Sequence, residues 1–296
     1  MLCAPLLVSA ACEKKPNKPN DTGAVAALDQ AVNGSATEGA ADATPLPGID
    51  ISKLDAEKTK TFYKLVGSLK SPCGKAHSLR VSFTSDTACK RAPFAVRYVS
   101  ALLEDEASET QAREEYAKKY EKTPPTVTLD TSKAPRAGTD TAPVKLAEFF
   151  DYECPHCAVF KVAMDQVIAN RPGVVGVSFM MFPLSSHRDS KSAAQAALAA
   201  HRQGKFKEMH EKLFAETPRH AREAVVGYAK ELGLDVGRFE RDYDEAAAQV
   251  ATDLKQGEDA GVEATPTVYF NNRKYEGPMY PKYLEMWIDE EIAVNR

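Results

Sequence analysis

Two hydrophobic patterns alternate along this chain, one with the period of a helix and one with the period of a strand. Between residues 50 and 122 the apolar positions fall on helical faces, in three groups at 54–69, 94–102 and 108–120. Ser108 and Gln111 have the spacing of a capping box at the start of the third group. The pattern predicts three short helices, and hence a small all-α domain over residues 50–122.

From residue 141 the pattern is typical of an α/β domain that extends to residue 296. Residues 144–150 are apolar enough for a buried strand, and helical spacing returns after Cys157. A strand therefore leads into a helix whose first turn carries both Cys154 and Cys157. A second strand is expected at 174–184, and a long alanine-rich helical stretch follows at about 188–261. Three helix-breaking residues divide that stretch into several helices: Pro218, Gly233 and Gly237.

The composition between these regions predicts linkers. Residues 13–49 contain no aromatic side chain, and the first aromatic residue of the chain is Phe62. Such a segment cannot bury enough apolar surface to offset its ordering entropy, so a disordered linker is expected over 13–49. Residues 123–140 are rich in Pro, Thr, Asp and Ala, which predicts a second linker with a short strand at 126–129.

The charge balance excludes some classes of protein. The chain has 38 basic and 42 acidic residues and a formal net charge of -4. Nucleic-acid-binding proteins usually carry a concentrated basic excess, so no nucleic-acid partner is expected. No apolar run reaches the length of about 18 residues that a membrane-spanning helix requires.

The N-terminus has the form of an export signal. Residues 3–11 are an apolar run ending in small residues, and Cys12 and then charged residues follow it. The run resembles a bacterial lipoprotein signal, although Ser9 stands where Leu or Val is usual. The resemblance implies a signal peptide over residues 1–12, lipidation at Cys12 and a location on the periplasmic side of the cell envelope. An ordinary cleaved signal and an apolar tail are the alternatives.

A separate cysteine pair lies in the predicted helical domain. Cys73 and Cys89 are sixteen positions apart in a loop-rich stretch, which in an exported protein favours a structural disulfide. A second redox pair is the competing interpretation, but the spacing is not CxxC. His77 suggests a metal site, yet one histidine and two cysteines fall short of four ligands, so no metal is predicted.

The sequence Cys154-Pro155-His156-Cys157 has the spacing that dithiol chemistry requires. At i and i+3 in a first helical turn, two sulfur atoms share a face and can close a disulfide with little backbone movement. The unpaired backbone N–H groups and the positive end of the helix dipole favour the thiolate of Cys154. Pro155 suits an early helical position, and His156 adds a donor or a positive charge. A stabilised thiolate makes the disulfide more oxidising.

These residues resemble the DsbA family of thiol-disulfide oxidoreductases. The likeness covers about residues 140–296 and includes Glu-Phe-Phe upstream of the dithiol and Thr265-Pro266-Thr267 near the C-terminus. It implies a thioredoxin-like fold with a helical insertion. It also implies that Glu148 is a buried acid that assists proton movement at the resolving thiol. Pro266 would be cis and, with Thr265, would hold an extended client chain.

The resemblance implies an exported oxidase that donates the Cys154–Cys157 disulfide to folding proteins and needs a membrane redox partner, DsbB-like or DsbD-like. No cofactor is expected. DsbA itself has valine where this chain has Thr265, so a reductase or isomerase kept reduced by its membrane partner is the alternative. A non-catalytic module on a thioredoxin scaffold is another. Ala158 stands where a c-type haem site needs histidine, and a zinc knuckle would need a second CxxC.

Overall fold

The computed structural model describes residues 41–122 and 126–295. The predicted signal peptide, Cys12 and most of the first predicted linker lie outside these residues. The chain from Asp42 onward forms one compact unit. Within it Leu46 is 5% exposed, and the Arg80 guanidinium donates a hydrogen bond to the Thr44 carbonyl at 2.6 Å. The prediction of a disordered linker is therefore wrong for the last residues of that segment. The average composition of the segment does not reveal that one apolar residue, Leu46, is buried.

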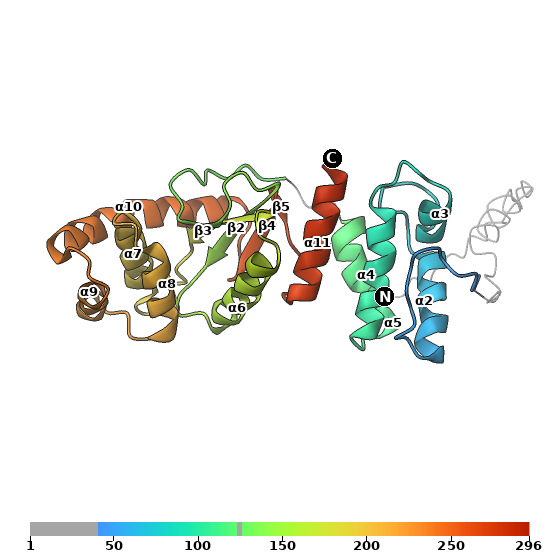
Figure 1. The fold of residues 1–296 in the computed structure, drawn as a ribbon, viewed down its shortest axis with the longest axis horizontal. Coiled ribbons are helices and arrows are strands. Elements are labelled where there is room, and N and C mark those ends of the chain that lie inside the picture. Colours follow the sequence, from blue (N-terminus) through green and yellow to red (C-terminus); the bar gives the residue numbers. More distant parts are fainter. Residues whose placement is uncertain (1–40, 123–125, 296) are drawn as a thin grey trace, which may run out of the picture. The chain divides into compact units, whose positions relative to one another are not determined.

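Four α-helices and a π-helical turn make up residues 50–122 (Figure 1): α2 (Ala56–Ser68), α3 (Leu79–Thr84), α4 (Ala92–Glu104), α5 (Glu109–Tyr116) and η1 (Ala117–Glu121). Side chains of Asp55, Ser78 and Ser108 cap three of the helices, and Ser108 forms the capping box with Gln111. Helix α3 has only six residues and buries only Leu79 and Ser82, which is too short a stretch for a helical period to be recognised.

A disulfide joins Cys73 to Cys89 across the loop that contains α3, with an S–S distance of 1.97 Å. A closed loop of this length removes denatured-state entropy worth about 3 kcal/mol in the chain-entropy model. Cys89 is 4% exposed, so its sulfur belongs to the apolar interior of this helical region. The pairing of Cys73 with Cys89 is the one that the sequence predicts.

The remaining chain is built on a five-stranded sheet of order β1-β3-β2-β4-β5. Its strands are β1 (Arg136–Gly138), β2 (Val144–Phe150), β3 (Val175–Met181), β4 (Thr267–Phe270) and β5 (Arg273–Lys274). Only β2 and β3 are parallel, joined through helix α6 (Pro155–Asn170). The strand expected at 126–129 is wrong: Thr126 makes a single bridge to Arg273, and the strand that pairs with β3 is β1.

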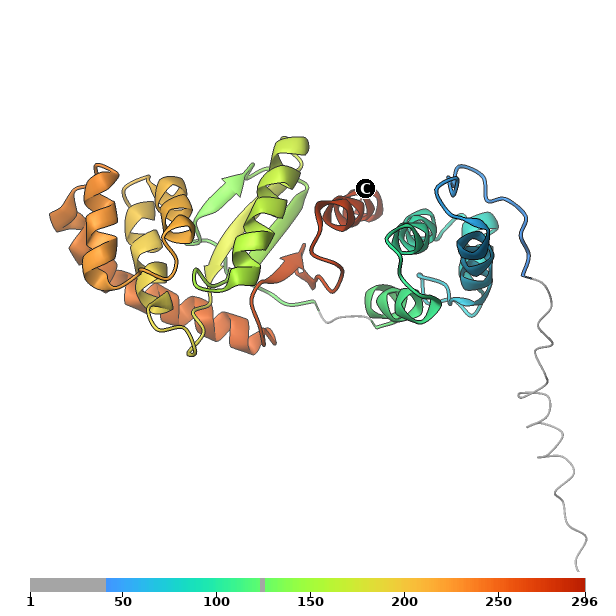
Figure 2. The same ribbon diagram turned by 90° about the horizontal axis from the view of Figure 1, so that it is seen from below.

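Four helices lie between β3 and β4 in the sequence, and one follows β5: α7 (Ser190–His201), α8 (Phe206–Ala215), α9 (Arg222–Glu231), α10 (Val236–Asp259) and α11 (Pro281–Val294). Gly237 lies in the first turn of α10 and so does not end a helix as expected. Helices α6 and α10 cover opposite faces of the sheet (Figure 2). The predicted α/β class with a helical insertion is confirmed.

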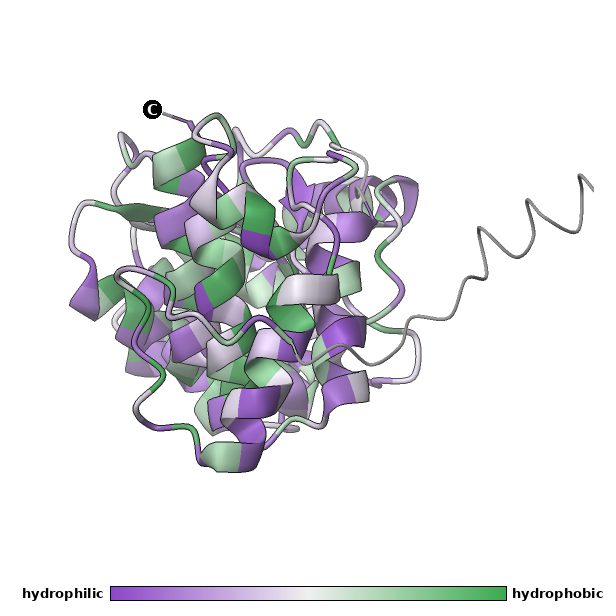
Figure 3. Cartoon of the chain, turned by 90° about the vertical axis from the view of Figure 1, so that its right-hand side faces the viewer, coloured by the Kyte–Doolittle hydropathy of each residue, from purple (hydrophilic) through white to green (hydrophobic). Residues whose placement is uncertain are grey.

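Apolar and polar segments alternate along the helices (Figure 3), as expected of helices with one buried face. The main apolar core joins one face of β2 and β3 to α6, the helical insertion and Trp287 of α11. Trp287 is 2% exposed, so its indole ring belongs to this core. None of the helices in the described ranges combines the length and apolar character needed to cross a membrane.

A buried charge cluster joins η1 and α4 to α11. The Glu290 carboxylate lies 2.7 Å from Lys119 Nζ and 2.6 Å from an Arg91 guanidinium nitrogen. Tyr120 donates its hydroxyl to the same carboxylate at 3.0 Å, and Lys119 Nζ lies 3.4 Å from the centre of the Trp287 ring. Burial lowers the pKa of Lys119 to about 8 in spite of the attraction of Glu290.

Candidate active site

The dithiol lies where strand β2 passes into helix α6. Asp151 Oδ1 accepts the Glu153 N–H at 2.7 Å, which closes a tight turn, and the Asp151 carbonyl accepts the Cys154 N–H at 3.2 Å. Cys154 has extended backbone angles at the N-cap of α6, and Pro155 follows at the first helical position, where no N–H donor is needed. The turn thus delivers Cys154 to the N-terminus of the helix, as the sequence predicts.

The two sulfur atoms occupy different environments. Both cysteines are free thiols; Cys154 is 6% exposed, whereas Cys157 is fully buried. Pro155 and His156 between them are exposed. Burial raises the pKa of the Cys157 thiol well above its ordinary value; contact with the Asp151 backbone lowers it by less, and Glu148 raises it further. Cys154 is therefore the less buried of the two cysteines, and Cys157 remains protonated behind it.

Thr265 and Pro266 lie against Cys154, although they come from the far end of the sequence. The Cys154 thiol donates to the Thr265 carbonyl at 3.2 Å, and the bond between Thr265 and Pro266 is cis. Thr265 is 7% exposed, and its hydroxyl has no hydrogen-bond partner within the protein. The structure thus brings together the dithiol and the threonine-proline pair that the sequence identifies.

Glu148 lies on β2, opposite Phe179 in the register with β3. It is 4% exposed, and burial raises the pKa of its carboxyl to about 8, with a smaller contribution from the negative charge of Asp165. Lys161 acts in the opposite direction. Lys161, Asp165 and Phe179 line a hollow of about 550 Å³ between α6 and α8. Glu148 is thus a neutral acid at pH 7, close to polar groups that contact solvent.

Three residues immediately before Cys154 are each held by a histidine, and sequence reasoning missed all three contacts. His187 Nδ1 lies 2.8 Å from Asp151 Oδ2, and His210 Nδ1 lies 2.9 Å from the Tyr152 hydroxyl. His220 Nδ1 lies 3.4 Å from Glu153 Oε1.

Two of these histidines are buried, since His210 is 6% exposed and His220 is fully buried. Burial also lowers the pKa of His210 to about 3. The irregular spacing of the histidines in the sequence did not indicate that they contact the residues before Cys154. Two acidic residues around one tyrosine, directly after an apolar strand, were the available clue.

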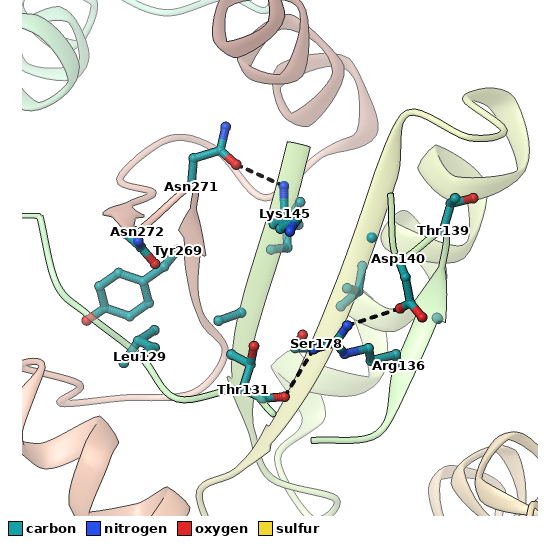
Figure 4. Close-up of a pocket in the computed structure, with 15 residues that line it drawn as sticks. Leu129, Thr131, Arg136, Thr139, Asp140, Lys145, Ser178, Tyr269, Asn271 and Asn272 are labelled. Carbon is teal, nitrogen blue, oxygen red and sulfur yellow. Dashed lines mark hydrogen bonds and ion pairs between the residues drawn. The ribbon is translucent and has the colours of Figure 1, made fainter. Parts of the chain in front are cut away.

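A second hollow, of about 350 Å³, opens over β2, β3 and β4 (Figure 4). Arg136 donates to Asp140 at 3.1 Å and to the Thr131 carbonyl at 3.4 Å, and Asn271 accepts the Lys145 N–H at 3.0 Å. These polar groups already satisfy one another, and neither cysteine of the dithiol lines the hollow. In residues 41–122 and 126–295, no three His, Cys, Asp or Glu side chains are grouped as metal ligands.

Comparison with known proteins relates the α/β region to one family. A family model described as Thioredoxin matches residues 130–290, more than half of the chain. The chain is 27% identical to a thioredoxin-like oxidoreductase from Silicibacter pomeroyi DSS-3, with a TM-score of 0.50 over 57% of this chain and 97% of that one. Oxidised BdbD from Bacillus subtilis is 25% identical, with a TM-score of 0.51 over 58% of this chain and 99% of that one.

Curated relatives include sodium/proton antiporters. The chain is 32% identical over 155 residues to the Na(+)/H(+) antiporter NhaA 3 of Salinispora tropica, a match that covers 51% of this chain and 24% of the antiporter. It is 34% identical over 142 residues to NhaA of Herminiimonas arsenicoxydans, covering 47% and 22%. The chain therefore spans about a quarter of the length of these relatives or less.

Proposed function

The chain belongs to the thioredoxin family, and from this premise we propose that it is an exported thiol-disulfide oxidoreductase whose reacting pair is Cys154 and Cys157. One observation carries the proposal. The Cys154 thiol lies at the N-terminus of α6 on the Thr265 carbonyl, and the protonated Cys157 is buried beneath it. Disulfide exchange needs a nucleophilic thiol nearer the surface and a second, more buried thiol that resolves the mixed disulfide, and this arrangement has that form.

The proposed reaction moves two electrons from a client dithiol to the enzyme disulfide. A client thiolate attacks Cys154 Sγ, the Cys154–Cys157 bond breaks, and Cys157 leaves as a thiolate. A second client thiolate then attacks the client sulfur of the mixed disulfide and releases Cys154 as a thiolate. The client gains a disulfide, and the enzyme is left as the dithiol.

Each neighbouring residue has a role in these steps. Glu148, neutral at pH 7, gives its proton to the departing Cys157 thiolate, whose high pKa makes it a ready acceptor. The N–H groups of the first turn of α6 favour the anion at Cys154. His156, exposed beside Cys154, adds a donor or a positive charge. The backbone at Thr265 and Pro266 pairs with an extended client chain.

We propose that the pair acts as a disulfide donor. The Pro-His dipeptide and the helix N-terminus favour the Cys154 thiolate, which stabilises the dithiol form and makes the disulfide oxidising. The direction of electron flow then requires a membrane partner that reoxidises the dithiol. A reductase or isomerase supplied with electrons is the second candidate, because Thr265 stands where DsbA has valine.

The proposed location is the periplasmic side of the bacterial cell envelope, with Cys12 as a lipid anchor. The clients would be exported proteins that form disulfides as they fold. The apolar run before Cys12 and the disulfide between Cys73 and Cys89 support export, because structural disulfides persist in oxidising compartments.

Replacing each cysteine by serine tests the proposal. In the chain with Cys3 and Cys12 replaced by serine, reduced Cys157→Ser protein mixed with insulin is expected to accumulate a covalent mixed disulfide, since Cys154 can attack but nothing resolves the product. Cys154→Ser is the matched control and should form no mixed disulfide with insulin. Its rate of thiol-disulfide exchange should fall to background. Mass spectrometry of acid-quenched samples measures the adduct. A Cys157→Ser protein that forms no adduct would overturn the assignment of Cys154 as the nucleophile.

A further inference from the structure

The hollow between α6 and α8 has an apolar interior that the dithiol chemistry does not use. Its volume of about 550 Å³ is within the range of small-molecule pockets, and neither Cys154 nor Cys157 lines it. The rings of Phe179, Phe206 and His210 line it together, with ring centroids 4.9 to 5.1 Å apart. Ile168 of α6 adds an aliphatic side chain to the lining. The hollow therefore offers an aromatic group a surface to pack against.

The charged side chains at this hollow are paired with one another. Three such pairs have nitrogen-to-oxygen distances of 2.6, 4.0 and 3.1 Å: Lys161 with Asp165, Lys207 with Glu211, and Arg136 with Asp140. Each positive charge thus has a negative neighbour, so the lining favours an uncharged ligand over an ionic one.

His210 supplies the hollow with one polar atom that has no partner. The side chain is 6% exposed, and its Nδ1 lies 2.9 Å from the Tyr152 hydroxyl. The other ring nitrogen, Nε2, has no hydrogen-bond partner among the described residues. It is not fully enclosed by protein atoms either, so it opens onto the hollow that His210 lines.

Tyr152 decides which nitrogen of His210 carries hydrogen. Tyr152 is 1% exposed, and within the described ranges its hydroxyl has only His210 Nδ1 as a partner. A hydrogen on Nδ1 would leave the hydroxyl hydrogen buried without an acceptor, which is costly. The hydroxyl therefore donates to Nδ1, and the ring hydrogen is on Nε2. Burial lowers the pKa of His210 to about 3, so the ring is neutral at pH 7.

We propose that this hollow is a binding site for an uncharged aromatic compound that carries an acceptor oxygen, such as an aryl ketone. The ligand ring packs against Phe179 and Phe206, and the ligand oxygen accepts the Nε2–H of His210. The donor is buried and unpaired in the free protein, so an oxygen that reaches it gains a hydrogen bond that solvent supplies poorly. The site is independent of the proposed function, since it requires neither cysteine.

Two probes of similar shape test the hydrogen bond. Acetophenone has the acceptor oxygen, and ethylbenzene has the same ring without it. In His210→Phe the aromatic wall remains but the donor is lost. The ratio of the two dissociation constants should therefore shift about fivefold against acetophenone, as expected for one neutral hydrogen bond. NMR titration of the full chain measures both constants. An unchanged ratio would show that His210 does not bind the oxygen.

A substitution on α6 tests whether the probes bind in this hollow. Ile168→Trp fills space from the lining without removing His210 or Tyr152, and it should weaken binding of both probes at least tenfold. Val162→Trp is the matched control, because Val162 is 67% exposed on the same helix, and both affinities should stay within about twofold of wild type. Equal affinities in Ile168→Trp and wild type would place the probes elsewhere and overturn the proposal, as would a wild-type protein that binds neither probe.

Side-chain ¹⁵N NMR of the wild-type protein gives an independent answer if the variants do not fold. At pH 7 His210 should carry hydrogen on Nε2 and none on Nδ1. The Nε2 signal should shift on addition of acetophenone and stay in place on addition of ethylbenzene. A hydrogen on Nδ1, or an Nε2 signal that acetophenone leaves unchanged, would contradict the proposal.

Discussion

Cys157 and Glu148 are two buried acids whose protonation is linked to the proposed chemistry. Burial raises both pKa values, so in the dithiol form both groups are neutral at pH 7. A neutral Glu148 near a buried thiol can supply the proton that the thiolate needs when the disulfide opens. Burial of Glu148 also lowers the free energy of unfolding at any pH where its carboxyl is ionised in the unfolded chain.

This cost predicts a pH-dependent difference between wild type and Glu148→Gln. The pKa of Glu148 in the folded state is about 8, above the ordinary value of 4.5. The stability of wild type relative to Glu148→Gln is therefore fully present below pH 4.5 and is lost as the pH rises through 8. Between pH 4.5 and pH 8, wild type should lose on the order of 4 kcal/mol of unfolding free energy relative to Glu148→Gln.

Urea unfolding of the dithiol forms across this pH range measures the difference. Glu263→Gln removes an exposed carboxylate and is the control, with the same pH profile as wild type expected. A Glu148→Gln profile parallel to that of wild type would show that Glu148 does not titrate as a buried acid.

For single residues, the sequence predicted those features of the site that depend on residues adjacent in the chain. The CxxC spacing predicted Cys154 at the helix N-terminus, and the family resemblance predicted that Glu148 is buried. The histidine contacts could not be predicted in the same way. His187, His210 and His220 reach the dithiol turn only after the helical insertion folds back onto it, and no local pattern encodes that return.

Among the helices, α11 has two buried roles. Trp287 packs against the sheet residue Phe270, with ring centroids 6.0 Å apart. Glu290 is fully buried and forms ion pairs with Lys119 of η1 and with Arg91, which precedes α4. Removing one member of a buried charge cluster leaves the others uncompensated, which costs about 3–5 kcal/mol in comparable cases.

Glu290→Gln should therefore lower the unfolding free energy by about 3–5 kcal/mol. Asp289→Asn, on the same helix, removes an ion pair with Arg171 at the surface and should cost about 1 kcal/mol or less. Chemical denaturation of the two variants gives the comparison. Equal losses in both would show that the Glu290 cluster does not contribute as a buried charge network.

Long elements were predictable and short ones were not. Strand β2 and helix α6 have clear apolar periods, and the structure contains both. Helix α3 and strand β1 have too few residues for a period, and their positions depend on tertiary contacts: the disulfide loop for α3, and the β3 edge for β1.

For the whole molecule, the predicted order of a helical region followed by an α/β region with an insertion is present from residue 42 onward. The composition predicted a linker up to residue 49, but one buried leucine, Leu46, already belongs to the folded unit. Which regions contact one another was not encoded in any local pattern, as the cluster of Lys119 and Glu290 illustrates.

The proposed function depends on Cys154 and Cys157 forming an oxidising redox pair. The most direct test is the equilibrium reduction potential of this pair in a glutathione buffer, measured on the chain with Cys3 and Cys12 replaced by serine. We expect a value near that of DsbA, about -120 mV. A value near that of thioredoxin, about -270 mV, would contradict it and would favour a reductase or isomerase supplied with electrons.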